Sequence, residues 1–405
     1  MSNEDSSIVK FIDDLTIEFE KKNAIELRKK MEPILNITRD YISDNQIILY
    51  GGMAMNMYLP KHDKFYTEYD IPDYDGLIFN AMNQAKRFGE LLKKKKFNYL
   101  LVRKALHEGT YTTTWEFRTV ADFTELDKVS YNDLLKKATV VDNMKICPLN
   151  LIKSSGYIEL CMPESSLFRW SKIHHRLSLL EKHHKVKSSY KMKNLFMDEK
   201  HNKLDKVLDV ILKYVIQAKL PLVGVKAIMY YLKKDIWSHT TLDNFRYISC
   251  VSDTISETVV ALTNLLTSLN VEFIVLPESR LSSLMTPKVN IDIIFGNTSY
   301  KLMSIHNAST RCVSYVEVSC KASKIRVVSV FYILYTLYFY LYHFESNVKD
   351  VCKKQTEYVV SRLLEKKNNK SMFSTTCAGH FQTVSAVKKD RLDKNINGKI
   401  YSHHI

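Results

Sequence analysis

The chain has 405 residues, of which 45% are hydrophobic and 25% charged. That mixture is typical of globular proteins and excludes a wholly disordered or fibrous chain. Ten glycines and eight prolines are too few for a collagen-like or proline-rich protein. The 59 Lys and Arg residues outnumber the 44 Asp and Glu residues, which gives a net charge of +15. This excess indicates an anionic partner such as RNA, DNA or an acidic membrane, unless it reflects only a lysine-rich coding bias.

The seven cysteines are scattered along the chain and form no CxxC pair. Because disulfide frameworks and zinc sites usually show clustered cysteines, we expect reduced thiols and an intracellular protein. The polar first 20 residues predict neither a signal peptide nor a transit sequence. Residues 327–344 approach the length of a membrane span but contain five tyrosines. Each hydroxyl would need a partner in hydrocarbon, so we expect a buried helix and no membrane association.

The apolar residues of 5–44 recur at helical spacing and predict one or two helices. A double glycine then follows a short apolar run, which predicts a strand, a turn and a helix. The pattern continues as alternating strands and helices, typical of an α/β or α+β module. The predicted elements are strands at 47–50, 77–79 and 97–102, helices at 53–59 and 81–92, and a strand pair or one bent strand over 111–126.

Beyond residue 170 the pattern predicts mostly helix, with strand-like patches at 271–276, 289–295 and 312–318. Positive charge gathers in 171–203 and in the last 45 residues, where either segment could contact nucleic acid or form only a solvated surface. We therefore predict four parts: an N-terminal helical segment (1–45), a catalytic module (46–185), an α+β C-terminal domain (186–360) and a basic tail (361–405).

Three acids carry the predicted chemistry. Asp73 and Asp75 are two residues apart, so on an extended strand both carboxylates lie on one face, within reach of one divalent cation. Asp122 lies among apolar neighbours, where an unpaired carboxylate would be costly and a metal ion would relieve that cost. Gly51 and Gly52 lie where a strand meets a helix and leave room for a phosphate to approach the backbone. Together these residues predict a two-metal site for nucleotidyl transfer.

The order of these motifs resembles the poly(A) polymerase catalytic subunits of large DNA viruses, of the poxvirus, African swine fever virus, iridovirus and mimivirus type. Residues 51–56 (GGMAMN) and 71–75 (IPDYD) are similar to the GG-x-A-x-N and PDYD signatures of this family. The resemblance extends over residues 46–180 and is thin beyond them. Further matching segments are 107–111 (HEGTY), 120–124 (VADFT), 157–160 (YIEL) with Pro163, and 169–172 (RWSK). Residues 308–315 show a weaker similarity to the family.

The resemblance implies an α+β fold: a nucleotidyltransferase (polymerase-β-like) module, and a C-terminal domain that would be a degenerate second copy without the acids. It implies ATP as donor, the 3′ end of single-stranded RNA as acceptor, and two Mg²⁺ or Mn²⁺ ions. Asp73, Asp75 and Asp122 would be the catalytic metal ligands. The remaining contacts to the nucleotide or RNA would come from Gly51, Gly52, Asn56, Arg169 and Lys172, with a helix-surface role as the alternative for Arg169 and Lys172; Trp170 is expected in the core.

Two features depart from the family pattern. Gly76 and Leu77 follow the PDYD motif where the family usually has aromatic residues and Ser, which would alter packing beneath the metal site. The chain is also short for the family, so a terminal element for RNA handling could be reduced.

The sequence leaves other functions open. One alternative is a non-catalytic RNA-binding or assembly subunit, although such a subunit would have little reason to keep all three acids. Another is a nucleotidyltransferase of different nucleotide specificity. A homodimer or a separate processivity subunit is a further candidate partner. We expect the protein in the host cytoplasm, with the virion as an additional candidate location.

Overall fold

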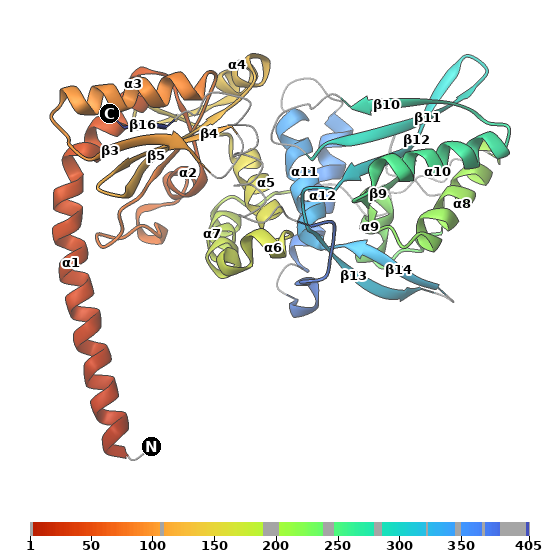
Figure 1. Ribbon diagram of the computed structural model, residues 1–405. Helices are drawn as coiled ribbons and strands as arrows, with labels where there is room; N and C mark the ends of the chain where they lie inside the picture. Colours follow the sequence, from red (N-terminus) through yellow and green to blue (C-terminus); the bar gives the residue numbers. More distant parts are fainter. Residues whose placement is uncertain are drawn as a thin grey trace. The chain divides into compact units, whose positions relative to one another are not determined.

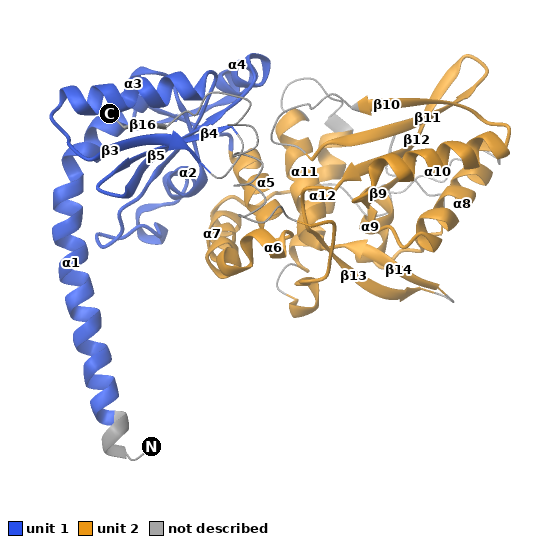
Figure 2. Cartoon of the chain, viewed as in Figure 1, with its two compact units in different colours: residues 1–148, 392–405 blue, residues 149–391 orange. Residues whose placement is uncertain are grey.

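A computed structural model describes residues 3–105, 109–188, 202–237, 247–278, 286–320, 323–344, 350–366, 369–380 and 402–404. The chain divides into two compact units (Figure 2): unit 1 comprises residues 1–148 and 392–405, and unit 2 comprises 149–391. The predicted catalytic segment 46–185 therefore contributes to both units. His107 and Glu108 of the family-like motif, Lys191 and Lys193, and most of the predicted tail lie outside the described residues.

Unit 1 contains an eight-stranded sheet in the order β16-β3-β4-β5-β2-β1-β7-β6 (Figure 1). Its strands are β1 (Ile48–Tyr50), β2 (Tyr74–Ile78), β3 (Leu100–Lys104), β4 (Thr110–Trp115), β5 (Arg118–Glu125), β6 (Thr139–Val141), β7 (Met144–Ile146) and β16 (Ser402–His404). Its helices are α1 (Asn3–Asp44), α2 (Gly51–Met57), α3 (Ala81–Lys94) and α4 (Lys128–Lys137), with a 3₁₀ turn at Lys61–Asp63.

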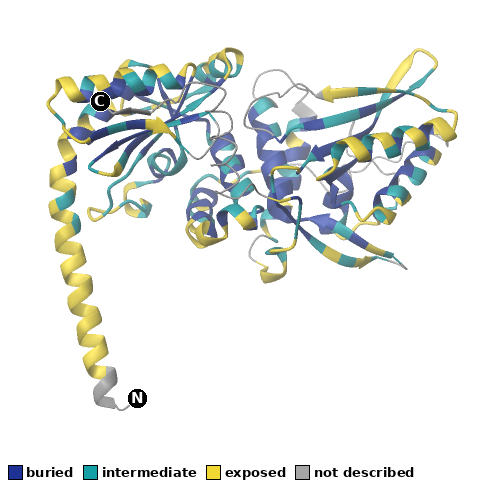
Figure 3. Ribbon diagram, viewed as in Figure 1, coloured by how far each residue is buried: buried dark blue, intermediate teal, exposed yellow. Residues whose placement is uncertain are grey.

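Two helices cover one face of this sheet. The ring centroid of Phe123 in β5 lies 5.9 Å from that of Phe88 in α3 and 6.3 Å from that of Tyr41 in α1. Side chains alternate along a strand, so the neighbouring Asp122 and Thr124 face the opposite side of the sheet. The apolar contacts of Phe123 thus decide which face carries the acid. Residues 7–23 of α1, in contrast, are all exposed (Figure 3).

Unit 2 also contains an eight-stranded sheet, in the order β10-β11-β12-β9-β8-β14-β13-β15. Its strands are β8 (Leu222–Val223), β9 (Ile248–Ser252), β10 (Glu272–Glu278), β11 (Lys288–Phe295), β12 (Thr298–Asn307), β13 (Val313–Cys320), β14 (Ser323–Val328) and β15 (Cys377–Ala378). Its helices are α5 (Leu149–Glu159), α6 (Pro163–Ser166), α7 (Trp170–His183), α8 (Asn202–Gln217), α9 (Gly224–Tyr231), α10 (Ile255–Ser268), α11 (Val330–Phe344) and α12 (Asp350–Leu364), with 3₁₀ turns at Leu167–Arg169 and Lys370–Met372.

The two sheets share one topology. Strands β8 to β14 follow one another along the chain and pair in the same order and with the same directions as β1 to β7. In both sheets the central pair, β2–β5 or β9–β12, is parallel and its outer neighbours β4 and β11 are antiparallel. The predicted second copy of the nucleotidyltransferase module is thus present as a repeated topology.

The sequence prediction underestimated the strands of unit 2. Every residue of β9 is buried, so this strand shows no alternation of polar and apolar residues. A short apolar run of that kind cannot be told from part of a buried helix by periodicity alone. In unit 1 the helix after the double glycine begins at Gly51 rather than at residue 53.

The apolar stretch predicted as a buried helix is α11. The hydroxyl of Tyr338 donates to Glu181 Oε1 at 2.6 Å, and the hydroxyl of Tyr335 accepts from the backbone N–H of Thr286 at 2.9 Å. Tyr332 and His306 Nδ1 are hydrogen bonded at 3.0 Å. Among the described residues no helix is long and apolar enough to cross a membrane.

The prediction that all cysteines are free thiols is wrong. Cys312 and Cys377 form a disulfide, although 65 positions separate them in sequence. The pair meets because β15 forms antiparallel hydrogen bonds with the start of β13. Scattered cysteines gave no sign of this pairing because the contact depends on a strand arrangement that sequence spacing does not encode.

Candidate active site

Asp75 and Asp122 are direct neighbours in the sheet of unit 1. β2 and β5 are parallel, and their register pairs Asp75 with Asp122. Paired residues on adjacent strands project from the same face, with Cβ atoms about 5 Å apart. Both side chains are half-buried, and the Oδ1 atom of Asp122 is buried. Two predicted metal ligands are therefore brought together by strand register.

The same row of residues continues across the sheet. Tyr50 on β1 pairs with Asp75, while Thr112 on β4 pairs with Asp122 and, on its other side, with Arg103 on β3. We call this set, Tyr50, Asp75, Asp122, Thr112 and Arg103, the acid row. It places one exposed cation on the face of the acids, two strand spacings or about 10 Å from Asp122.

Hydrogen bonds between side-chain hydroxyl groups connect the strands beside the acid row. The hydroxyl of Tyr50 and Oγ1 of Thr124 lie 2.9 Å apart, and Thr124 Oγ1 lies 2.9 Å from Oγ1 of Thr110. These bonds link β1, β5 and β4. Tyr50 belongs to the acid row, and Thr124 and Thr110 lie two residues along from Asp122 and Thr112 on the same face, so these bonds hold the strands that carry the carboxylates.

Asp73 lies just before β2 and is half-buried. It follows Pro72, whose position next to the strand start agrees with the expectation that proline is tolerated there. The side chain of Asn56 in α2 is buried, and its Oδ1 accepts hydrogen bonds from the backbone N–H groups of Phe65 and Tyr66 at 2.9 and 3.3 Å. Asn56, predicted as a nucleotide contact, thus anchors the loop that leads to Asp73.

Gly51 allows the closest approach of backbone to carboxylate. Its φ of +67° belongs to the left-handed region, which side chains rarely adopt. A Cβ atom at this position would collide with Oδ2 of Asp75. Gly51 therefore leaves the space in which the Asp75 carboxylate lies. Gly52 follows it in the first turn of α2.

Two other acids, at the end of β5 and in the β4–β5 turn, have different roles. Glu125 accepts the backbone N–H of Asn80 at 2.7 Å and that of Ala81 at 2.5 Å, so it caps the start of α3. Glu116, in the turn between β4 and β5, forms an ion pair with Lys30 at 2.5 Å. Asp122 is consequently the best placed third acid.

The three carboxylates fit a divalent cation by their chemistry and placement. Mg²⁺ prefers oxygen ligands and often takes one or two carboxylates together with substrate phosphates. The oxygens of Asp73, Asp75 and Asp122 do not all lie within 4.8 Å of one another. Because like charges repel, we expect carboxylates to spread in the absence of a cation. Closing the site around an ion then requires the three carboxylates to move toward one another.

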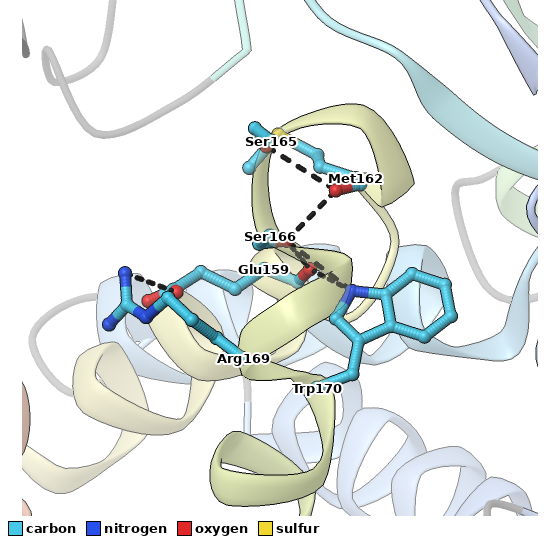
Figure 4. A network of polar contacts seen from close by, with 6 residues as sticks. All are labelled: Glu159, Met162, Ser165, Ser166, Arg169 and Trp170. Carbon is cyan, nitrogen blue, oxygen red and sulfur yellow. Dashed lines mark hydrogen bonds and ion pairs between the residues drawn. The ribbon is translucent and has the colours of Figure 1, made fainter.

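The remaining predicted contacts belong to unit 2. Nη1 of Arg169 lies 3.1 Å from Oε2 of Glu159, whose pKa is raised by burial and lowered in part by Arg169 and Arg176 (Figure 4). Trp170 is buried and donates from Nε1 to the Glu159 carbonyl at 2.9 Å, as expected for a core residue. Arg169 thus has a local ion-pair role, whereas Lys172 is exposed on α7.

A basic cavity also belongs to unit 2. It has a volume of about 340 Å³, and its lining includes Lys153, Lys185, Lys187 and Lys353 against one acid, Glu357. The first residues of α5 also line it, so a helix N-terminus adds partial positive charge. This cavity brings Lys185 and Lys187 of the predicted basic segment together with a lysine far along the chain.

Sequence reasoning missed two members of the acid row with functional potential. Arg103 lies in a strand that was predicted from its apolar residues, and no motif singled it out. Tyr50 ends the run before the glycines and looked like an apolar strand residue. Only the register of five strands places them beside the acids.

Comparison with known proteins agrees with this geometry. Residues 36–166 match the model of the family named poly(A) polymerase catalytic subunit. The resemblance to this family is confirmed. The matched residues include Gly51, Gly52, all three acids and the whole acid row.

Individual relatives match part of the chain. A predicted poly(A) polymerase catalytic subunit of African swine fever virus (strain Badajoz 1971 Vero-adapted) is 27% identical over 183 residues, which cover 42% of this chain and 37% of that protein. A predicted catalytic subunit of Acanthamoeba polyphaga mimivirus is 26% identical over 117 residues, or 25% of this chain and 20% of its own. The match thus spans well under half the length of these relatives.

The whole fold matches a solved structure. The crystal structure of the Megavirus polyadenylate synthase aligns with a TM-score of 0.78 at 16% identity, covering 100% of this chain and 85% of that one. At this identity the likeness establishes the fold, including the part of unit 2 beyond residue 166 that the family model does not reach.

Proposed function

We propose that this protein is a template-independent poly(A) polymerase that transfers AMP from ATP to the 3′-hydroxyl of RNA and releases pyrophosphate. The pairing of Asp75 with Asp122 beside Gly51 is the observation that carries this proposal. The confirmed family resemblance of residues 36–166 supports it.

In this proposal Asp73, Asp75 and Asp122 hold two Mg²⁺ or Mn²⁺ ions. Bound ions would neutralise phosphate charge and favour the ionised form of the attacking hydroxyl. The reaction forms a bond from the RNA 3′-oxygen to the α-phosphorus and breaks the bond from that phosphorus to the bridging oxygen of the leaving pyrophosphate. The hydroxyl proton leaves to solvent.

The chain's own residues position the two substrates. Gly51 and Gly52 leave the backbone free of side chains, so a triphosphate can lie against the start of α2. Arg103, at the far end of the acid row, would pair with a phosphate oxygen of the donor or the RNA. Tyr50, Thr124 and Thr110 keep β1, β5 and β4 in fixed register, which limits the reorganisation needed during transfer.

The basic cavity of unit 2 supports an RNA partner. Lys153 is buried, with Nζ 2.9 Å from Glu181 Oε2 and 2.6 Å from the His184 carbonyl oxygen. Burial lowers the pKa of Lys153, and Glu181 opposes that shift. Lys185, Lys187 and Lys353 then leave an excess of positive charge for phosphates of a single strand.

A primer-extension assay tests the proposal. The full chain would be incubated with labelled single-stranded RNA, Mg²⁺ or Mn²⁺, and each nucleoside triphosphate separately, with an Asp75→Asn/Asp122→Asn double variant as control. Extension with ATP alone, absent from the control, supports the proposal. Equal use of all four nucleotides indicates a terminal nucleotidyltransferase of different specificity. RNA binding without any extension indicates the non-catalytic subunit.

A further inference from the structure

We propose that unit 2 contains a second ligand site, at the place that corresponds to the acids of unit 1, and that it binds a phosphate group without a metal ion. The proposal does not depend on the catalytic function of unit 1. The shared chemistry is a phosphate group, either free or carried by a nucleotide.

The backbone around this site repeats that of the active site. β8 leads through Gly224, with φ of +58°, into α9, as β1 leads through Gly51 into α2. A Cβ atom on Gly224 would lie 3.2 Å from Oγ of Ser249. Ser249 pairs with Val223 on one side and, in parallel register, with Ser304 on the other. Ser249 and Ser304 thus take the places of Asp75 and Asp122.

This exchange changes which ligand the site can hold. Two carboxylates repel a phosphate unless a cation lies between them, whereas two hydroxyls can donate hydrogen bonds to it directly. Serine hydroxyls are poor ligands for a divalent cation compared with carboxylates. The second site is therefore suited to an anion and poorly suited to a metal.

A cavity of about 50 Å³ opens at this position. Val223, Gly224 and Val225 at the start of α9 line it together with Ser249. Ser249 is only 3% exposed and makes no hydrogen bond from its hydroxyl to another described residue. The N-cap residue Val223 provides no side-chain cap for the first N–H groups of α9. A buried hydroxyl and a helix N-terminus thus converge on one small cavity.

The surroundings of the cavity are positive. Its described lining contains no Asp or Glu. Two of the lining residues are tyrosines, and a lysine ammonium group lies over the ring of each. Lys301 Nζ lies 4.4 Å from the ring centroid of Tyr247, and Lys288 Nζ lies 5.9 Å from the ring centroid of Tyr340. Neither lysine lines the cavity itself, but both raise the electrostatic potential inside it.

His306 also lines the cavity and is neutral at pH 7. Burial, together with the charges of Lys288 and Lys301, lowers its pKa to about 3. Its Nδ1 is hydrogen bonded to the hydroxyl of Tyr332 at 3.0 Å. If that hydroxyl donates, the ring carries its proton on Nε2 and offers one more donor.

The size of the cavity limits the ligand. A volume near 50 Å³ holds a phosphate group or a few waters, because one water needs roughly 10–15 Å³ by the same measure. Ile228, Leu337 and Val359 contribute apolar lining beside the polar groups. A whole nucleotide would therefore place only its phosphate inside and leave the nucleoside at the opening.

Calorimetric titration and thermal shift test the proposal on the full chain. The Asp75→Asn/Asp122→Asn variant in EDTA removes metal-dependent binding at the active site, and inorganic phosphate and AMP serve as separate probes at constant ionic strength. We expect saturable binding of at least one probe and a matching rise in melting temperature. If only AMP binds, the phosphate is recognised together with its nucleoside. Absence of saturable binding for both probes would overturn the proposal.

Further substitutions in that background locate the binding. Ser249→Ala should weaken it about tenfold, since a hydrogen bond to a charged group is lost, and Ser249→Asp should abolish it by repulsion. Cys250→Ala is the matched control, because Cys250 is the next residue of β9, equally buried, and faces the opposite side of the sheet. Phosphate affinity unchanged by Ser249→Asp would place the anion elsewhere and reject the site.

Discussion

Asp75 and Asp122 lie side by side because two parallel strands hold them in register, and their charges oppose that placement unless a cation is bound. Each of Asp73→Asn, Asp75→Asn and Asp122→Asn should reduce primer extension on the order of 10³-fold, as expected for a loss of several kcal/mol of transition-state stabilisation. The melting temperature without metal should stay the same or rise, because one repulsive charge is gone.

Asp133→Asn provides the control for these variants, because Asp133 lies in α4 and pairs with Lys137 at 3.0 Å, away from the acid row. It should extend primers normally. Near-normal extension by the Asp122→Asn variant would show that Asp122 is not a metal ligand.

Gly51 is required by geometry and not only by chain flexibility. Gly51→Ala should lower the free energy of unfolding by more than about 1 kcal/mol, because a positive φ is strained for alanine and its Cβ would collide with the Asp75 carboxylate. A double-mutant cycle with Asp75→Ala checks the cause. In the Asp75→Ala background the same substitution should cost less, and equal costs in both backgrounds would mean that the collision is unimportant.

Lys226 makes the free energy of unfolding change with pH in the alkaline range. Burial lowers its pKa to about 8, and the nearby Asp209, Asp235 and Asp205 oppose that shift only in part. Between pH 8 and pH 10.5 the unfolded chain binds this proton and the folded chain does not, so the contribution of Lys226 to stability becomes more favourable as pH rises. Below pH 8 the buried charge costs about 3 kcal/mol.

Denaturant titrations of the parent and of Lys226→Met at several pH values measure this effect. The variant should be the more stable protein at pH 7, and its advantage should shrink toward pH 10.5. A difference that does not change with pH would reject the assigned shift.

At the scale of elements, the disulfide attaches the short strand β15 to β13. Two paired residues form a weak strand, and Gly379 beyond it would bring a Cβ into collision with the carbonyl oxygen of Ala308, so this segment packs closely. Closing a loop of 65 positions reduces the entropy of the unfolded chain. Reduction should therefore destabilise unit 2 by about 2–4 kcal/mol.

Thermal unfolding with and without a thiol reductant measures the contribution of the disulfide. The oxidised parent should melt at the higher temperature, while Cys377→Ser should melt at one temperature in both conditions. A parent protein that is insensitive to reductant would show that the β13–β15 contact does not need the covalent bond.

For the whole molecule, the net charge of +15 and the basic cavity predict RNA binding that weakens steeply with salt. Replacing Lys185, Lys187 and Lys353 by Gln should flatten the slope of log affinity against log salt by about two to three phosphate contacts. Turnover at saturating RNA should change little, because the acid row is intact.

Replacing Lys93, Lys94 and Lys95 of unit 1 by Gln makes the matched control, since it removes the same charge from an exposed helix end. Filter binding across a salt series compares the two triple variants. If both lose the same slope, the cavity has no special role and only net charge matters.

The sequence by itself determined which residues make up the candidate active site and the chemistry predicted for it. The spacing of Asp73 and Asp75, the double glycine and the lone acid at position 122 are local patterns, so they could be interpreted before any contact was known. The same holds for α3, whose apolar residues follow helical spacing, and for α11, whose tyrosines argued against a membrane span. Local residue order is sufficient wherever period and residue type carry the signal.

Tertiary structure alone decided which distant residues meet. The register of β2 with β5 pairs Asp75 with Asp122, and the register of β3 with β4 adds Arg103 to the same row. The repeated topology likewise places Ser249 and Ser304 where the acids would be, and strand pairing brings Cys312 to Cys377. A shift of one residue in any of these pairings would turn the side chains to the other face of the sheet. Register is set by the burial of whole strands and helices together, and no short stretch of sequence contains that information.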